Sequence, residues 1–60
     1  MTTFTVQIEL GNAAFDGEVE MSHEIARILR RLAADVECGH VLQTLYDVNG
    51  NRVGRASLTD

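Results

Sequence analysis

The sequence predicts an α+β domain of the type β-α-β-β, with a three-stranded antiparallel sheet and one helix packed on one face. Residues 2–10 alternate between apolar and polar side chains, which is the period of a half-buried strand. Residues 21–36 carry apolar side chains at helical spacing, and Asn49-Gly50 separates two further apolar alternations, as a hairpin turn does. These elements use nearly all of residues 1–60, so we expect one small domain with the strand order 2-3-1.

The first strand is defined by its alternation. Phe4, Val6, Ile8 and Leu10 fall on one face, while threonine, glutamine and glutamate side chains occupy the other. The glycine and asparagine that follow interrupt the pattern. In the connection to the helix we expect Phe15 to reach the core.

The helix is expected to begin at Ser22, which can act as an N-cap, although its start could also lie as far back as Asp16. Gly39 suits the left-handed residue that follows a last helical turn, so the helix should end near Glu37 or Cys38. The apolar stripe that should face the sheet comprises Met21, Ile25, Ile28, Leu29, Leu32 and Val36.

The hairpin has two possible registers. A two-residue loop would place Tyr46 opposite Val53, whereas a three-residue loop with Gly50 as a bulge would place Leu45 opposite Val53. The sequence does not decide between them. The hairpin strands should comprise residues 41–47 and 52–58.

In the hairpin strands, apolar residues occur at positions that point to both faces of the sheet, so the second face should also be partly apolar. The two sets are Leu45 and Val53 on the one hand, and Leu42, Tyr46, Ala56 and Leu58 on the other. One helix covers only one face, and exposed apolar sheet surface is typical of an interface. Cys38 is the only cysteine, so no internal disulfide can stabilise this small core. We therefore expect a homodimer.

The charges argue against a general nucleic-acid binder. Nine acidic residues outnumber five basic residues and give a net charge of −4, whereas phosphate contacts require an excess of basic side chains. All five basic residues are arginines, whose planar guanidinium suits bidentate contacts to carboxylates or phosphates. We therefore expect directional contacts with a partner instead of diffuse attraction to nucleic acid.

Three sets of charged residues are candidates for partner binding: the arginines of the helix, the arginines of the hairpin and the acidic residues at the start of the helix. The helix arginines have a simpler interpretation as a solvated face with Glu24–Arg27 and Arg31–Asp35 pairs. The acidic residues also have a simpler interpretation, because the helix dipole favours negative charge at the start of a helix. The candidate partner-binding residues are Arg27, Arg30, Arg31, Arg52, Arg55, Asp16, Glu18 and Glu20.

Metal binding and catalysis are not expected. Asp47, Asn49 and Asn51 have the spacing of the first ligands of a calcium loop, but Arg52 stands where that loop needs glycine and Leu58 where it needs glutamate. Turn chemistry explains these residues better, with Asp47 accepting hydrogen bonds from the turn backbone.

The residues that could bind zinc or act as a nucleophile fit no known site either. Cys38 and His40 lack the paired spacing of a zinc site, and His23 lies at the far end of the helix. A nucleophilic Cys38 would need an oriented base and a substrate cleft, which a chain this small seldom encloses. We therefore expect no metal, no cofactor and no enzymatic activity.

We expect no signal peptide, because the N-terminal residues carry no positively charged side chain and no unbroken apolar run. No stretch approaches the roughly 20 apolar residues of a membrane span. The sequence therefore predicts a protein of the cytoplasm with no membrane partner.

Three segments resemble a class of very short proteins from bacteriophages and mobile elements. They are the "NAAF" of residues 12–15, the "ARILRRLA" of residues 26–33 and the "DVNGNRVG" of residues 47–54. Small acidic phage proteins of this size include inhibitors of host defence, among them anti-CRISPR proteins, which bind a host nuclease complex and catalyse nothing. The resemblance implies stoichiometric binding to a host protein complex, such as a CRISPR effector. The alternatives are a structural or oligomerisation module and a small nucleic-acid-binding regulator.

Overall fold

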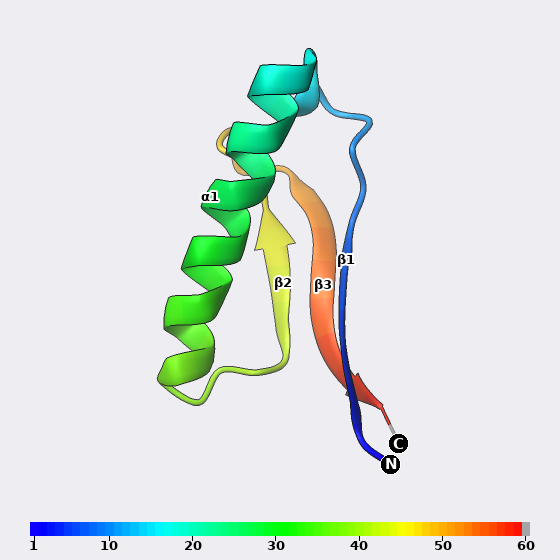
Figure 1. Ribbon diagram of the computed structural model, residues 1–60, viewed down its shortest axis with the longest axis vertical. Coiled ribbons are helices and arrows are strands. Elements are labelled where there is room, and N and C mark those ends of the chain that lie inside the picture. Colours follow the sequence, from blue (N-terminus) through cyan, green and yellow to red (C-terminus); the bar gives the residue numbers. More distant parts are fainter. Residues whose placement is uncertain (60) are drawn as a thin grey trace.

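The computed structural model describes residues 1–59 and has the predicted β-α-β-β architecture (Figure 1). The three strands form one antiparallel sheet in the order β1-β3-β2, and α1 packs against one face of it. The predicted α+β fold and strand order are therefore confirmed. The elements are β1 (Thr3–Ile8), a 3-10 turn η1 (Ala13–Phe15), α1 (Glu18–Glu37), β2 (Gln43–Tyr46) and β3 (Arg52–Thr59).

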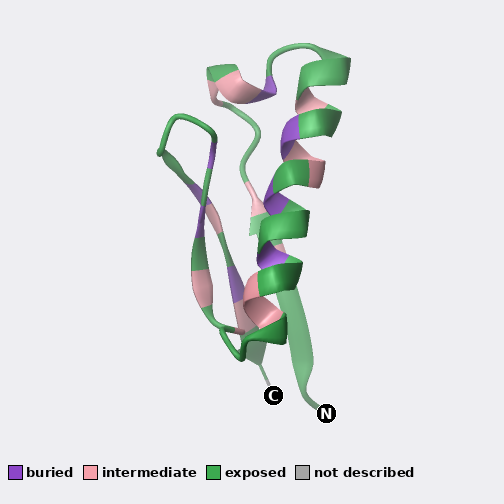
Figure 2. Ribbon diagram, turned by 90° about the vertical axis from the view of Figure 1, so that its left-hand side faces the viewer, coloured by how far each residue is buried: buried purple, intermediate pink, exposed green. Residues whose placement is uncertain are grey.

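The core lies between α1 and the sheet, and the buried positions of α1 follow the side that faces the strands (Figure 2). Phe15 is buried, as predicted, and closes the end of the core at the start of α1. The partly buried side chains of Val6 and Ile8 pack against the core from β1. The buried apolar residues are Phe15, Ile28, Leu32, Leu45, Val53 and Ala56.

The helix begins one turn earlier than the Ser22 N-cap predicts. Gly17 occupies the N-cap position with a φ of 85°, and its carbonyl accepts a hydrogen bond from the Met21 N–H at 2.9 Å. Acidic side chains in the first turn stabilise this earlier start through the helix dipole. Ser22 therefore lies inside the helix, so its predicted N-cap role is wrong, whereas the observed start at Glu18 lies within the range back to Asp16 that the sequence left open.

The end of the helix agrees with the sequence. Gly39 has a φ of 93°, its N–H donates to the Val36 carbonyl at 2.9 Å, and the His40 N–H donates to the Asp35 carbonyl at 2.9 Å. This pair of bonds is a Schellman motif, in which glycine supplies the left-handed residue. The predicted end near Glu37 or Cys38 is confirmed.

The apolar stripe of the helix is rotated from its predicted position. Leu29 is 44% exposed, whereas Glu24 is only 7% exposed. Glu24, Ile28 and Leu32 follow one another at four-residue spacing, so the line of closest contact with the sheet runs along them. Assigning Leu29 to the buried stripe was therefore wrong.

The hairpin loop contains three residues, Val48, Asn49 and Gly50. The Asp47 N–H donates to the Asn51 carbonyl at 2.9 Å, and the Gly50 N–H donates to the Asp47 carbonyl at 3.0 Å. Gly50 has a φ of 82°, the left-handed conformation that this loop requires. Of the two loop lengths compatible with the sequence, the longer one forms.

A β-bulge in β3 changes the register beyond the loop. Tyr46 pairs with Arg52 and Leu45 pairs with Gly54, so Val53 lies between these partners as the extra residue. Both predicted pairings of Val53 are therefore wrong. Between the turn and the bulge, the strands pair in the register expected for a three-residue loop. Beyond the bulge, they pair in the register expected for a two-residue loop.

The bulge also explains why apolar residues occur at both parities. Val53 and Ala56 are both buried although they are three residues apart, because the extra residue reverses the alternation. The sheet face away from α1, called the outer face below, is polar, and the prediction of a second apolar face is wrong. Its residues are Thr3, Thr5, Gln7, Thr44, Tyr46, Arg52, Arg55, Ser57 and Thr59.

Candidate functional site

The hairpin that carries the outer face is held in shape by the buried side chain of Asp47. Its Oδ1 accepts hydrogen bonds from the backbone N–H groups of Asn49 at 2.9 Å and Asn51 at 2.8 Å. Its Oδ2 accepts bonds from the side-chain amides of Asn12 at 3.1 Å and Asn51 at 3.2 Å. Burial of this carboxyl raises its pKa, but the hydrogen bonds outweigh that effect and leave the pKa of Asp47 below its ordinary value. The predicted role of Asp47 in the turn is confirmed.

A second carboxylate fixes the hairpin to the helix. Glu24 Oε2 accepts a hydrogen bond from the Val48 N–H at 2.6 Å. The Arg27 Nε and Nη2 atoms donate to the two Glu24 oxygens at 2.6 and 3.1 Å, and Nη2 also donates to the Tyr46 carbonyl at 3.2 Å. One turn of α1 therefore contacts the chain on both sides of Asp47.

These contacts change the protonation of both partners. The hydrogen bond from Arg27 holds the pKa of Glu24 below its ordinary value of 4.5, although burial opposes it, and the Val48 N–H adds to the lowering. The same hydrogen bond raises the pKa of Arg27. Both groups therefore remain charged at neutral pH, and Arg27 is engaged in holding the hairpin.

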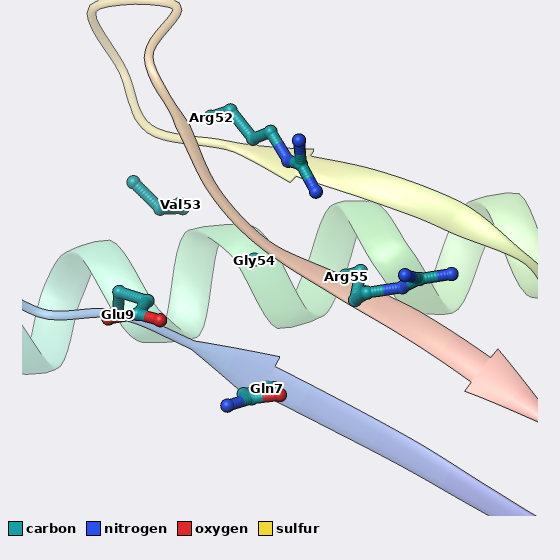
Figure 3. Close-up of a pocket in the computed structure, with 6 residues that line it drawn as sticks. All are labelled: Gln7, Glu9, Arg52, Val53, Gly54 and Arg55. Carbon is teal, nitrogen blue, oxygen red and sulfur yellow. The ribbon is translucent and has the colours of Figure 1, made fainter.

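The outer face presents two neighbouring arginines. Arg52 lies opposite Tyr46, and Arg55 lies between Gln7 on β1 and Thr44 on β2. Arg52 and Arg55 are three residues apart, so in a regular strand they would point to opposite faces; the bulge brings them to the same face. Their side chains both extend from β3 on the side shown in Figure 3, with α1 behind the sheet.

An open hollow of about 490 Å³ lies beside these arginines. One wall is formed by Gln7 of β1 and by Glu9 just after that strand, and Glu9 is the acidic residue among those that line the hollow (Figure 3). Arg52 and Arg55 line it from β3, so two positive residues and one negative residue border the hollow, and both guanidiniums extend toward β2 (Figure 3). Exposed guanidiniums of this kind can bind a carboxylate or phosphate through charge-assisted hydrogen bonds. The residues that line it are Gln7, Glu9, Arg52, Val53, Gly54 and Arg55.

The arginines of β3 differ from the arginines of α1 in whether they form ion pairs with carboxylates of the chain. Within residues 1–59, neither Arg52 nor Arg55 has a carboxylate within salt-bridge distance, although the chain has nine acidic residues. Two unpaired guanidiniums on one face of an acidic protein are therefore suited to an anionic group from outside.

The helix arginines are arranged differently. The two ion pairs expected from the sequence form, with Arg27 Nε 2.6 Å from Glu24 Oε1 and Arg31 Nε 3.5 Å from Asp35 Oδ2. Arg30 is exposed on the same helix. Because α1 covers the opposite face of the sheet, the structure does not join these arginines to Arg52 and Arg55 in one patch.

The other candidate residues lie at the two ends of α1. Asp16, Glu18 and Glu20 are exposed around its start, where they favour helix formation. Cys38 is exposed at its end, and His23 and His40 are exposed as well. In the part of the chain that the structure describes, no group of three histidine, cysteine or acidic side chains is arranged to hold a metal ion.

No family model matches the chain, and the searches of curated proteins and of solved structures also found no match. The helix present in residues 1–59 is not apolar enough to cross a membrane. The functional argument therefore rests on the geometry of the outer face.

Sequence reasoning missed the residues that fix the hairpin from outside it. Glu24 could have been found, because it lies four residues before Ile28 and eight before Leu32 and so falls on the buried line of the helix. An acidic residue on such a line needs a partner. Asn12 gave no comparable signal, since its contact with Asp47 spans 35 residues.

Proposed function

We propose that this protein is a non-enzymatic interaction module that binds an anionic surface of a host protein complex through Arg52 and Arg55. The observation that carries the proposal is the position, on one polar sheet face, of two guanidiniums that have no ion-pair partner within residues 1–59. The hydrogen bonds accepted by Asp47 and Glu24 fix the hairpin loop, so the backbone that leads into Arg52 is ordered before a partner arrives. Preorganised groups lose less conformational entropy on binding.

The class of partner follows from the resemblance to short proteins of bacteriophages and mobile elements. Inhibitors of host defence in that class act by stoichiometric binding, which needs a stable surface and no catalytic pocket. We propose a host nuclease complex of the CRISPR type as the first target to examine. Phosphates and acidic side chains are the groups that guanidiniums bind in a bidentate manner.

The test is affinity capture from bacterial lysate with two matched double variants. Arg52→Ala with Arg55→Ala removes the outer-face charges, and Arg30→Ala with Arg31→Ala removes the same charge from the helix. Arg27 is left intact because it holds the hairpin. Circular dichroism first confirms that each variant is folded. We expect the captured partner to be lost with the sheet variant only.

Other outcomes would assign the function elsewhere. Loss of capture with the helix variant alone would transfer binding to Arg30 and Arg31. Loss only after Asp16, Glu18 and Glu20 are changed to Asn, Gln and Gln would indicate an acidic surface that mimics nucleic-acid charge. Tight binding to single-stranded DNA or RNA, abolished by the sheet variant, would favour the nucleic-acid regulator instead.

A further inference from the structure

The outer edge of β1 has none of the features that normally block strand pairing. β1 is an edge strand of the sheet, and in Figure 1 it forms the margin farthest from α1. Its sequence, TFTVQI, contains no charged residue, no proline and no glycine. Natural proteins protect edge strands with charges, prolines, bulges or short length, because exposed edges recruit other strands.

The backbone groups on this edge can be assigned from the register. The Glu9 N–H donates to the Val53 carbonyl at 2.7 Å, so Glu9 is a hydrogen-bonded position of the β1–β3 pair. Alternation then directs the backbone groups of Thr5 and Gln7 toward β3. The N–H and C=O groups of Phe4, Val6 and Ile8 point away from it, along the open edge.

Exposed apolar side chains lie next to this edge on the same sheet face as α1. Phe4 and Leu58 are cross-strand partners on that face, and they are 44% and 46% exposed. The helix lies nearer to β2 than to β1, so it leaves this end of the sheet uncovered. Leu10, beyond the end of β1, is 42% exposed. The edge therefore combines available hydrogen-bonding groups with exposed apolar surface.

The exposed area of the chain is compatible with a second copy as the occupant of this edge. The chain exposes 4379 Å², whereas a monomer of 6.6 kDa exposes roughly 3,900 Å². The difference of about 500 Å² corresponds to one side of a small protein interface. A second copy of the chain can cover this area while presenting the same unprotected edge.

We propose that the protein forms a two-fold symmetric dimer in which β1 pairs antiparallel with β1 of a second copy, giving a continuous six-stranded sheet. The register that pairs the open-edge backbone groups of Phe4, Val6 and Ile8 places Val6 opposite Val6 of the second copy and Phe4 opposite Ile8. On the outer face this register places Thr5 opposite Gln7 of the second copy. The outer faces of the two copies then adjoin, so the dimer presents Arg52 and Arg55 twice on one surface.

The test uses the charge of the facing pair Thr5 and Gln7. Thr5→Glu with Gln7→Glu places acidic residues directly opposite each other across the dimer, and like charges in this position are destabilising. Both side chains are exposed, and within the chain they face Ser57 and Arg55, so the fold should be retained. Thr5→Lys with Gln7→Glu places opposite charges across the same interface. Thr44→Glu, on the edge strand at the other side of the sheet, is the control.

Sedimentation equilibrium across the micromolar range should give twice the 6.6 kDa mass for the wild type, for Thr44→Glu and for the Lys–Glu variant. The Glu–Glu variant should dimerise at least about tenfold more weakly. A wild type with the mass of one chain at every concentration would overturn the proposal. An unaffected Glu–Glu variant would overturn the location of the interface, and a monomeric Lys–Glu variant would overturn this register.

Amide hydrogen exchange of the wild type provides a measurement that needs no variant. The amides of Phe4, Val6 and Ile8 should be protected at high protein concentration and lose protection on dilution, while those of Thr5 and Gln7 remain protected. Equal exchange of the first three at both concentrations would contradict the proposal. A monomeric result would leave the Arg52 and Arg55 proposal intact, because that site is complete within one chain.

Discussion

The carboxylate of Glu24 accepts a hydrogen bond of 2.6 Å from the backbone N–H of Val48, so the middle of α1 is joined directly to the hairpin loop. These two residues are 24 positions apart in the sequence. Turn residues alone would connect the loop only to its two strands. The contact with Glu24 also holds the loop against the helix and so restricts its local opening. The orientation of the outer face therefore depends on a side chain of the opposite layer.

Glu24→Gln should destabilise the protein by about 1–3 kcal/mol, because hydrogen bonds to a charged group are replaced by weaker neutral ones. Glutamine keeps the size of the side chain and one acceptor, so the fold should be retained. Urea denaturation at neutral pH measures the difference. Glu20→Gln is the matched control, since it is exposed one turn earlier in the same helix, and it should change stability by less than about 0.5 kcal/mol. Equal effects of both variants would contradict a clamping role for Glu24.

Stability should fall in acid as Glu24 and Asp47 become protonated. Folding lowers the pKa of both carboxyl groups from their ordinary values of 4.5 and 3.8, so the unfolded chain binds protons more readily than the folded one. Their contribution is fully present above those values and is lost as the pH falls through the lowered pKa values. Urea midpoints between about pH 6 and pH 3 should therefore decrease less in Glu24→Gln than in the wild type. Glu20→Gln should follow the wild type.

Arg27 and Arg30 should behave differently although both are arginines of the same helix. Arg27→Ala removes the hydrogen bonds to Glu24 and to the Tyr46 carbonyl, and it should cost about 1–3 kcal/mol. Arg30→Ala removes an exposed side chain and should stay within about 0.5 kcal/mol of the wild type. Thermal unfolding followed by circular dichroism compares the two. The outcome also decides which helix arginines can be changed in a binding assay without disturbing the hairpin.

The fold class was predictable because each element has its own sequence period and its own terminator. Alternation gives β1, the spacing of Ile25, Ile28 and Leu32 gives the helix, and Gly39 ends it. The rotation of the helix was less accessible. Leu29 and Glu24 both border the apolar stripe, and only packing against the sheet decides which of them is buried.

The candidate site was predictable as a set of arginines but not as a surface. Arg52 and Arg55 come together only because of the bulge at Val53, and a bulge depends on strand pairing that the sequence does not encode locally. The same bulge explains the parity pattern that suggested a second apolar face. A regular period of two therefore assigns the residues on one side of this bulge to the wrong face of the sheet.

Leu32→Ala and Leu29→Ala should separate the buried side of the helix from its exposed side. Leu32 is 4% exposed in the core, and its truncation should cost about 2–5 kcal/mol, enough to unfold a domain this small. Leu29 is largely in solvent, so its loss should cost less than about 1 kcal/mol. Alanine is itself a good helix former, so propensity does not separate the variants. Similar melting temperatures for the two variants would contradict the observed rotation of α1.

Gly54→Ala should destabilise the sheet where β1 and β3 approach most closely. A Cβ atom at Gly54 would overlap the backbone carbonyl of Gln7 and contact the Cα of Ile8, and neither backbone can move without disturbing the strand pairing. Overpacking of this kind costs about 1–3 kcal/mol. Gly11→Ala is the control, because a Cβ there meets nothing within 4 Å, and the change should be neutral or slightly stabilising by restricting the unfolded chain. Urea denaturation of both variants measures the contrast. A neutral Gly54→Ala would show that β1 lies farther from β3 than in this structure, and the hollow beside Arg55 would then have a different shape.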